Sequence, residues 1–279
     1  MTEFVPTAKG SNIRFPSTAN LYIDSADRSS GGASDFLINK PQNILTGFFT
    51  RLAVNEVVMD WSIPNVLASQ GNNTFVVVIT GTSAGTYTAT LPDGFYTVKS
   101  ALDAIVAQLN TDIGTTRFSI VVSDDGGVFL TIASGTYTIT ESILSEQLDL
   151  SDPTTAGTNK QVLDPLILNT KYVDIVSHNL TYNQDLKDAS TANNVRDVVY
   201  RWYFAWDNEA TYDAYNFPIL QGYRPFLQRR SIGFPKQIKW DNIQPIGQLG
   251  FQVYDSNGVI VNVAVGKLEF NMSLLVSEI

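Results

Sequence analysis

The chain has 279 residues, of which 44% are hydrophobic and 16% charged, a composition typical of a folded globular protein and unlike a disordered one. It contains no cysteine, which excludes disulfides, cysteine-ligated zinc and thiol catalysis. The net charge of −9 argues against a nucleic-acid coat, which needs a basic surface to neutralise phosphates, so we do not expect nucleic acid as a partner. No apolar run approaches the ~20 residues that span a bilayer, so we expect no membrane span.

The chain begins with a segment that shows little periodicity. Residues 1–19 are rich in Pro, Gly, Ser and Thr, and they are interpreted as an N-terminal arm, with a frayed terminus as an equal alternative. Residues 20–24 then alternate between apolar and polar side chains, as a half-buried strand does. They are predicted to be the first core strand.

A long β-rich run follows over residues 48–61. Its apolar side chains change phase in the middle, because Leu52 and Val54 share one phase and Val57 and Met59 share the other. A β-bulge at Asn55 or Glu56, where the phase changes, would let both halves face the same core. The sequence therefore predicts one strand with a bulge at this point.

Residues 71–157 differ in texture and are predicted to form an inserted α+β subdomain. Strands are expected over 75–79 and 86–91, and Thr97 can cap a helix. The apolar side chains of that helix recur every three or four residues, at Val98, Leu102, Ile105, Val106 and Leu109. Further strands are expected over 118–122, 128–132 and 137–140, and a polar linker over 151–159 closes this ββαββ-like block.

The all-β texture returns after the linker. Residues 172–176 and 195–206 read as strands, and the second of these is rich in aromatic side chains. Near the end, 249–253 and 267–274 alternate again, with a cluster of turn residues at 255–258. We expect the terminal thirty residues to form three antiparallel strands with one apolar face.

The phase of these strands constrains the first terminal turn. A two-residue turn would place Val253 opposite Asn262, whereas a three-residue loop over 256–258 places Val253 opposite Val261 and Phe251 opposite Val263. Apolar residues that share a face should be paired, so we predict the three-residue loop, with Gly258 in the left-handed conformation.

The predicted fold class is mostly β: a single jelly-roll β-sandwich with an inserted small α+β subdomain. About eight strands without helices lie outside the insert, and two sheets are an economical way to bury their apolar faces. An immunoglobulin-like sandwich is the alternative. The expected divisions are an arm at 1–19, a first jelly-roll part at 20–70, the insert at 71–157 and a second jelly-roll part at 158–279.

Catalytic and metal chemistry finds little support in the sequence. The single histidine, His178, lies at a predicted strand end, and no Gly-x-Ser-x-Gly elbow accompanies it. Loops around Asp24 and Asp124 carry several acidic residues, but their spacing does not match an EF-hand, and turn formation explains them better than calcium binding. We expect no enzyme activity and no cofactor.

Two groups of residues are candidates for binding. Trp202 and Trp206 share one phase of a strand and could form an aromatic face for a sugar, although buried core or interface aromatics are the commoner outcome. The second group is a basic segment between Gly222 and Trp240 that contains no acidic residue. Its members are Arg224, Arg229, Arg230, Lys236 and Lys239. The simplest interpretation is a solvated edge whose charges prevent strand-to-strand aggregation. The functional interpretations are a surface for an acidic partner and a contact with encapsidated nucleic acid, and of these two we favour the partner surface, because five charges with little aromatic interleaving suit nucleic acid poorly. Neutralising Arg229 and Arg230 should then weaken assembly with neighbouring subunits.

Four segments in this order are similar to one known family. They are Asn20–Arg28, Ile63–Asn65, Pro92–Thr97 and Leu249–Gly258. Together they resemble the penton, or minor capsid, proteins of virophages and polinton-like viruses. The resemblance implies a single jelly roll that assembles as a homopentamer at the vertices of an icosahedral virion, contacts the major capsid protein and carries an inserted outer domain that could meet a host receptor.

The resemblance also implies no catalysis, and it transfers no functional residues. A different class of function is a carbohydrate- or receptor-binding β-sandwich, in which the tryptophan face or the insert would be the binding site. The mass of the protein in solution distinguishes the two classes: a five-fold assembly supports the capsid protein, and a monomer that is retained on a glycan array supports the binding module.

Overall fold

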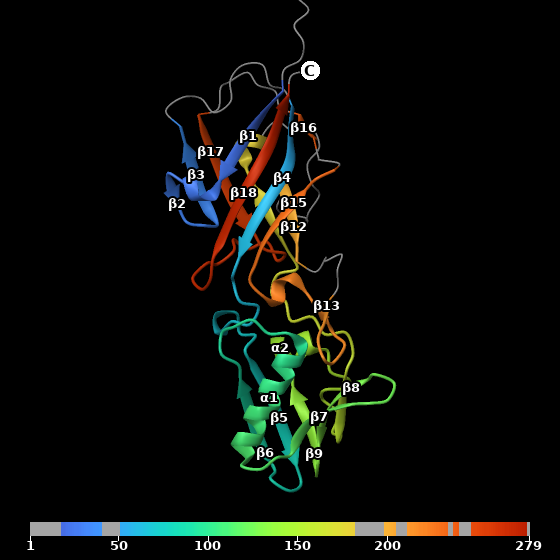
Figure 1. The fold of residues 1–279 in the computed structure, drawn as a ribbon. Helices are drawn as coiled ribbons and strands as arrows, with labels where there is room; N and C mark the ends of the chain where they lie inside the picture. Colours follow the sequence, from blue (N-terminus) through green and yellow to red (C-terminus); the bar gives the residue numbers. More distant parts are fainter. Residues whose placement is uncertain are drawn as a thin grey trace, which may run out of the picture.

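The computed structural model describes residues 18–40, 51–181, 198–204, 211–233, 237–239 and 247–277. Of the predicted arm at 1–19, residues 1–17 lie outside these ranges, and Thr18 and Ala19 belong to the first strand because they pair with Ser277 and Val276. The protein is mostly β, and Figure 1 shows two groups of sheets, one above the other. No helix in the described ranges is long and apolar enough to cross a membrane.

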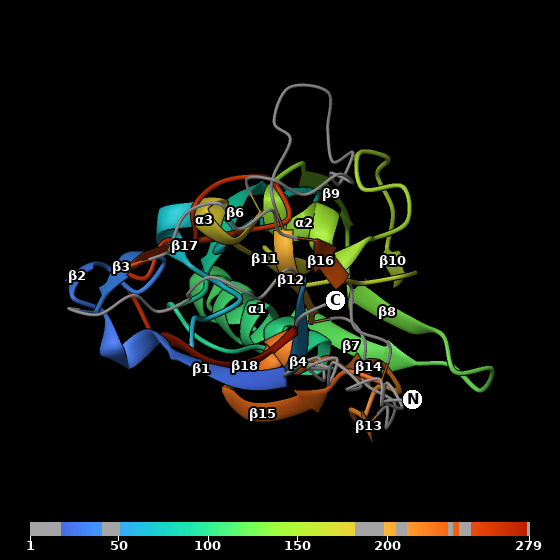
Figure 2. The ribbon, with the colours of Figure 1, turned by 90° about the horizontal axis from the view of Figure 1, so that it is seen from above.

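The upper group contains two five-stranded sheets, which Figure 2 shows from above on opposite sides of the molecule. We name them the β18 sheet and the β17 sheet after a central strand of each. The β18 sheet has the order β1 (Thr18–Asp24), β18 (Leu268–Ser277), β4 (Arg51–Trp61) and β15 (Phe226–Ser231), with β16 (Gln237–Lys239) also paired to β4. The β17 sheet has the order β12 (Val198–Tyr203), β11 (Tyr172–Val176), β17 (Gln248–Tyr254), β3 (Asp35–Asn39) and β2 (Ser30–Gly31).

The two upper sheets pack face to face through aromatic side chains. Phe36 and Phe251 of the β17 sheet lie 5.6 Å apart, and both approach Phe270 of the β18 sheet, at 5.7 and 6.0 Å between ring centroids. All three side chains are almost fully buried. Each comes from the apolar phase of an alternating strand, which explains why the alternation is so regular in β17 and β18.

The predicted bulge in β4 is confirmed. Ser273 of β18 pairs with Glu56, and the next residue, Leu274, pairs with Val54, so Asn55 has no partner in the ladder. Leu52 and Val54 on one side and Val57 and Met59 on the other are all buried. The extra residue thus turns both halves of the strand toward one core.

The lower group is formed by residues 74–162, which we call the 74–162 block. None of its described strands pairs with a strand of the upper sheets. One sheet has the order β6 (Gly85–Thr90), β5 (Thr74–Thr80) and β9 (Thr136–Thr140), and the other has the order β10 (Asn159–Val162), β8 (Val128–Ile132) and β7 (Phe118–Val122). Strand β10 was not predicted: Asn159 was expected to end the linker and the following residues to belong to the second jelly-roll part, yet β10 pairs with β8 beyond the expected boundary at residue 157.

Two helices belong to the 74–162 block. Helix α1 (Val98–Ile113) begins at the predicted cap Thr97, whose side chain accepts a hydrogen bond from the Ser100 amide, and it ends at Gly114 with φ +76°. Helix α2 (Ile143–Leu148) was not predicted, because six residues are too few to show a helical period. The remaining short elements are α3 (His178–Thr181), β13 (Thr211–Tyr212), β14 (Pro218–Ile219) and the 3-10 helices η1 (Ser25–Asp27), η2 (Ala68–Gln70) and η3 (Gln221–Tyr223).

The expected three-stranded terminal sheet is wrong, although the predicted turn is right. Tyr254 pairs with Ile260, the Val261 amide donates to the Val253 carbonyl, and Gly258 has φ +85°, as the three-residue loop requires. The pairing then stops, because the Asn262 side chain accepts a hydrogen bond from the Ala264 amide and turns the chain. The chain crosses from the β17 sheet to the β18 sheet, so β17 and β18 face each other across the core.

Candidate partner-binding surface

The basic segment predicted from the sequence lies along one edge of the β18 sheet. Strand β15 carries Arg229 and Arg230, and β16 carries Lys239. Lys236 and the side chain of Lys239 lie outside the described residues. The structure therefore places three members of the segment in full: Arg224, Arg229 and Arg230.

Arg230 points into the molecule and supports the core. Its guanidinium lies 4.1 Å from the centre of the Trp202 ring, and it donates hydrogen bonds of 3.1 Å to the Tyr203 carbonyl and to the Gln221 side chain. The Trp202 indole donates to the same Gln221 oxygen at 3.1 Å. Arg230 also opposes the effect of burial on the neighbouring Tyr200, whose pKa burial raises. This arginine is thus a structural cation, half covered by its own chain.

Arg229 and Arg224 face outward. The Arg229 side chain is 68% exposed and forms an ion pair with Glu56 of β4, on the outer face of the sheet. Arg224 is exposed and forms no ion pair with any residue that the structure describes. An exposed ion pair contributes at most about 1 kcal/mol to stability, so both arginines remain available to a partner.

The predicted aromatic face is not available for a ligand. Trp202 is fully buried between the two sheets, where it stacks on Phe226 at 6.0 Å. Trp206 lies outside the described residues. The even-numbered phase of β12 faces the core, so Trp202 serves packing. The carbohydrate- or receptor-binding alternative then rests on its other expected site, the inserted block.

Another arginine, Arg201 on β12, forms an ion pair with a buried aspartate. Arg201 makes two parallel hydrogen bonds to Asp174 of β11, at 2.6 and 2.9 Å, and its guanidinium lies 3.9 Å from the Tyr172 ring. The hydrogen bonds to Asp174 raise the pKa of Arg201 further above its already high value. Asp174 is fully buried, and Arg201 supplies a charged partner with good geometry for its carboxylate, which makes this pair structural.

Buried amide side chains join the upper sheets to the 74–162 block. Asn65, just after β4, donates to the carbonyls of Tyr96 and Ile167 and accepts from the Tyr96 amide, each at 2.8 Å. Asn72 donates to the Asn65 carbonyl at 2.8 Å and to Asn169 at 2.7 Å. These bonds connect three segments that are distant in sequence.

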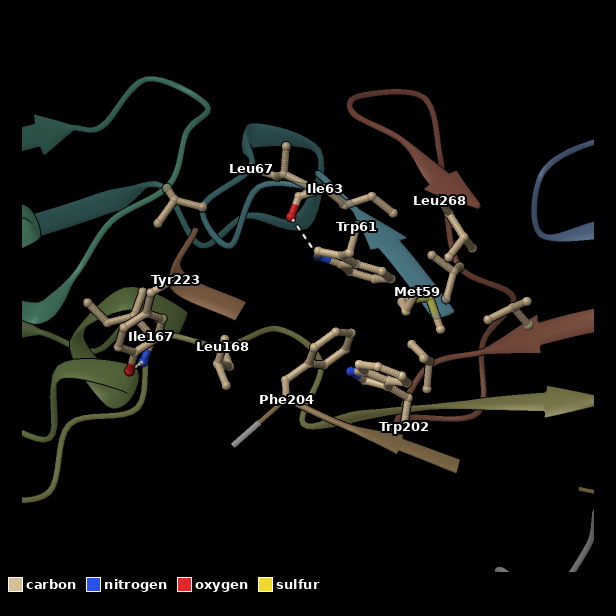
Figure 3. Close-up of a cluster of buried hydrophobic side chains, with 14 of the residues drawn as sticks. Met59, Trp61, Ile63, Leu67, Ile167, Leu168, Trp202, Phe204, Tyr223 and Leu268 are labelled. Carbon is tan, nitrogen blue, oxygen red and sulfur yellow. Dashed lines mark hydrogen bonds between the residues drawn. The ribbon is translucent and has the colours of Figure 1, made fainter. Parts of the chain in front are cut away.

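The apolar core is continuous through this junction. Figure 3 shows Trp61 beside Phe204 and Leu168, with the Trp61 indole donating to the Ile63 carbonyl at 3.1 Å. The Tyr223 hydroxyl accepts a hydrogen bond from the Ile167 amide at 3.0 Å, and burial raises its pKa. A pocket opens beside Trp61, but the Asn65 side chain at its wall already donates both amide hydrogens and accepts one hydrogen bond within the protein. We therefore assign the junction a structural role.

A short hairpin ties the upper sheets to helix α1. This hairpin, residues 211–219 with strands β13 and β14, is named the strap. Asp213 accepts a hydrogen bond of 2.9 Å from the Lys99 amide in the first turn of α1, and the Tyr215 hydroxyl donates to Asp103 at 2.8 Å. Burial and this hydrogen bond raise the pKa of Tyr215 to about 12.

The acidic loops behave as turns. The Asp24 side chain accepts from the Ala26 amide at 2.8 Å at the start of η1, and Asp125 accepts from the Gly127 amide at 3.2 Å. The bond from Ser123 lowers the pKa of Asp125. Within the described ranges no three His, Asp or Glu side chains gather as metal ligands would, and His178 is exposed at the start of α3.

Sequence reasoning missed two exposed apolar residues, Tyr22 on β1 and Leu227 on β15. Both sit on the polar phase of an alternating strand, Tyr22 between Asn20 and Asp24, and Leu227 beside Arg229. A large apolar side chain on a polar phase is a signal of an exposed contact that the sequence did contain.

Comparison with known proteins finds a similar fold among solved structures. No protein-family model and no curated protein matches the sequence. The crystal structure of selenomethionine-labelled mavirus penton protein aligns with a TM-score of 0.51 over 95% of this chain and 100% of that chain, at 11% sequence identity. Along nearly its whole length, this chain therefore has a fold similar to that of the mavirus penton protein.

Proposed function

We propose that this protein is a structural component of a virus capsid, and that five copies form the vertex of an icosahedral particle. The observation that carries the proposal is the fold similarity to a penton protein over 95% of this chain and 100% of that chain. In this role the protein works through shape, self-association and docking to the major capsid protein. We propose no catalysis and no cofactor.

Within this proposal, the two upper sheets form a single jelly roll and the lower group is an insertion between β4 and β11. The pairing of β10 with β8 supports an insert that ends near residue 162 instead of 157. The jelly roll would build the ring, and the 74–162 block would project from it toward solvent, where it could meet a host receptor. The arm stays part of the proposal as a segment that reaches a neighbour, shortened to residues 1–17 because Thr18 and Ala19 pair with β18.

The exposed part of the basic segment is the proposed contact surface. Arg224 and Arg229 lie at one flank of the subunit, and a closed ring brings one flank of each subunit against the opposite flank of the next. Arg230 is better left intact in a test, because its loss would disturb the packing of Trp202. Lys236 and Lys239 extend the same segment.

Mass in solution tests the proposal. Native mass spectrometry and negative-stain images of the purified protein are expected to show a five-fold ring, and a monomer at all concentrations would contradict it. Changing Arg224→Glu and Arg229→Glu together should raise the concentration needed for half assembly at least about tenfold, because opposite charges across an interface would become like charges. The matched control is Lys40→Glu with Lys171→Glu, which makes the same change in charge at two other exposed lysines.

A further inference from the structure

The β18 sheet ends in two edge strands, β1 and β15, whose outward backbone groups bond no residue that the structure describes. On β15 the Ile232 amide donates to the Asn55 carbonyl at 2.9 Å, so every second residue before it faces β4 and those between face away. The same alternation continues through the pairing of β4 with β18 and of β18 with β1, so every second residue of β1 faces β18 and those between face away. The outward residues are Asn20, Tyr22 and Asp24 on β1, and Leu227, Arg229 and Ser231 on β15.

These two edges carry the most exposed large apolar side chains in the described part of the chain. Tyr22 on β1 is 73% exposed and Leu227 on β15 is 72% exposed. Proteins usually protect an open strand edge with charge, proline or a covering loop. An apolar side chain on each of two opposite edges of one sheet instead indicates that both edges are covered in an assembly.

The two edges also carry opposite charge at the same level of the sheet. Residues 18–27 contain two acids and no base, whereas residues 224–231 contain three arginines and no acid. Asp24 pairs with Asn271, Asn271 pairs with Val58, and Val58 pairs with Arg229, so Asp24 and Arg229 end one row across the sheet. In the same way Tyr22 lies level with Ser231.

The strand count makes the edges complementary. At this level the sheet has four antiparallel strands, so β1 and β15 run in opposite directions. A rotation about an axis along the strands preserves these directions, and it places β15 of one copy antiparallel to β1 of the next. In a sheet with an even number of antiparallel strands, a row of paired residues that begins at an outward-facing residue on one edge also ends at an outward-facing residue on the other edge. When the two edges of neighbouring copies meet at the same level, outward backbone groups therefore face outward backbone groups.

We propose that neighbouring copies of this chain associate head to tail through these edges, with β15 of one copy beside β1 of the next. This inference rests on the proposed ring and names the surfaces that close it. Asp24 and Arg229 form its central charge pair, with Tyr22 opposite Ser231 on one side and Leu227 on the other. The contact is heterologous, so each copy uses both edges once and the ring can close.

Disulfide trapping tests this contact cleanly, because the chain has no cysteine of its own. The test variant is Tyr22→Cys with Ser231→Cys. Directly opposed residues in a hydrogen-bonded antiparallel pair lie about 5.5 Å apart between Cα atoms, within disulfide range. Within one copy the two sites are separated by three strand spacings, about 14 Å, so they cannot link to each other.

The expected result is a ladder of covalent multimers up to a closed ring from the oxidised double variant. An equal mixture of the two single variants should give covalent dimers and nothing longer. Each single variant alone should stay unlinked, and Tyr22→Cys with Leu227→Cys, which is displaced by four residues along the strand, should link at least tenfold more slowly.

The outcomes separate the contact from the ring itself. A five-fold assembly by mass without covalent links would overturn the edge contact and leave the ring standing. Covalent dimers from Tyr22→Cys alone would also overturn it, because they require two β1 edges to meet each other. A protein that is monomeric at every concentration would overturn both proposals.

Discussion

The 74–162 block and the β18 sheet treat their strand edges in opposite ways. In the block, residues 153–157 cover the edge of β9, where Tyr137 and Ile139 donate to the carbonyls of Gly157 and Pro153 at 2.9 and 2.7 Å. Residues 149–151 cover the edge of β10, where the Ser151 amide donates to the Gln161 carbonyl at 2.8 Å. In the β18 sheet, by contrast, β1 and β15 keep outward groups that no described residue covers.

Helix α1 completes the contrast. Its Gln108 accepts a hydrogen bond from the Thr90 amide at 2.9 Å on the edge of β6, and its Asn110 bonds both the amide and the carbonyl of Phe118 on the edge of β7, at 2.7 and 2.9 Å. The block therefore satisfies much of its edge backbone by itself. An uncovered edge is a template for another strand, so the difference separates a self-contained part of the molecule from a part suited to association.

The largest expected effect is the unfolding of the two upper sheets, which include the β18 sheet with its uncovered edges. Deleting residues 247–279 removes β17 and β18, which are internal strands of the two upper sheets. We expect the upper sheets to unfold completely. The stabilising free energy that β17 and β18 contribute to the two sheets exceeds the roughly 5–15 kcal/mol by which a typical domain is stable. Limited proteolysis should then leave a resistant fragment of about residues 71–163 that retains the helical circular dichroism of α1.

If that fragment is digested as fast as the upper sheets, the block is not self-contained. The full-length chain, treated with the same protease, is the control. It should lose neither part at the enzyme concentration that degrades the upper sheets of the truncated chain.

A medium effect on stability is expected when the loop that covers the edge of β9 is loosened. Lys160 is buried, and its ammonium donates to the carbonyls of Asp152 and Thr155, which holds the loop that covers β9. Lys160→Met keeps the apolar stem and removes these bonds, so we expect a loss of about 1–3 kcal/mol in the free energy of unfolding, measured by urea titration.

The same variant should speed hydrogen exchange at the amides of Tyr137 and Ile139, because their acceptors lie in the loop. Lys171→Met, at an exposed lysine outside the block, is the matched control and should change stability by less than about 0.5 kcal/mol. Unchanged exchange at both amides in Lys160→Met would show that the loop covers β9 without help from the lysine.

The smallest effect concerns the strap that joins the two parts. The pKa of Tyr215 is raised from 10 in the unfolded chain to about 12 in the fold. The neutral hydroxyl is the form that donates to Asp103, so its contribution to stability is complete below pH 10 and is lost between pH 10 and about 12. We expect the strap to loosen from α1 in this window.

Spectrophotometric titration of tyrosinate measures this step. The difference between the wild-type protein and Tyr215→Phe should be a single group with a midpoint near 12. Tyr212→Phe, on the same hairpin and exposed, should leave that late step in place. A difference curve centred at the ordinary tyrosine pKa of about 10 would contradict the buried hydrogen bond to Asp103.

Local signals in the sequence were enough to predict much of the secondary structure. Thr97 and the apolar spacing behind it predicted α1, the phase change at Asn55 predicted the bulge in β4, and the phase around Gly258 predicted the turn after β17. Each depends on residues within one or two turns or along one strand, where periodicity and turn chemistry act directly. Strand β10 and helix α2 were missed, because four and six residues carry too little pattern to read.

The candidate surface was predicted less completely. Composition located the basic segment, but it could not tell that Arg230 turns inward to Trp202 while Arg229 turns outward to Glu56. The alternation in β15 shows that Arg229 and Arg230 lie on opposite faces of the strand. It does not show which of the two faces is buried. For Trp202 a buried core aromatic was the favoured interpretation, and the structure agrees, whereas Arg230 was interpreted as a surface charge and instead packs against Trp202.

What the sequence determined by itself is the set of amphipathic strands, their turns and the one long helix. What only the tertiary structure decided is which sheet each strand joins: β17 and β18 look like neighbours along the chain, yet they face each other across the core. The physical reason is that alternation specifies a buried face without specifying the partner strand. Partners are chosen by long-range packing, such as that of Phe270 against Phe36 and Phe251, and the open edges at β1 and β15 are a consequence of that choice.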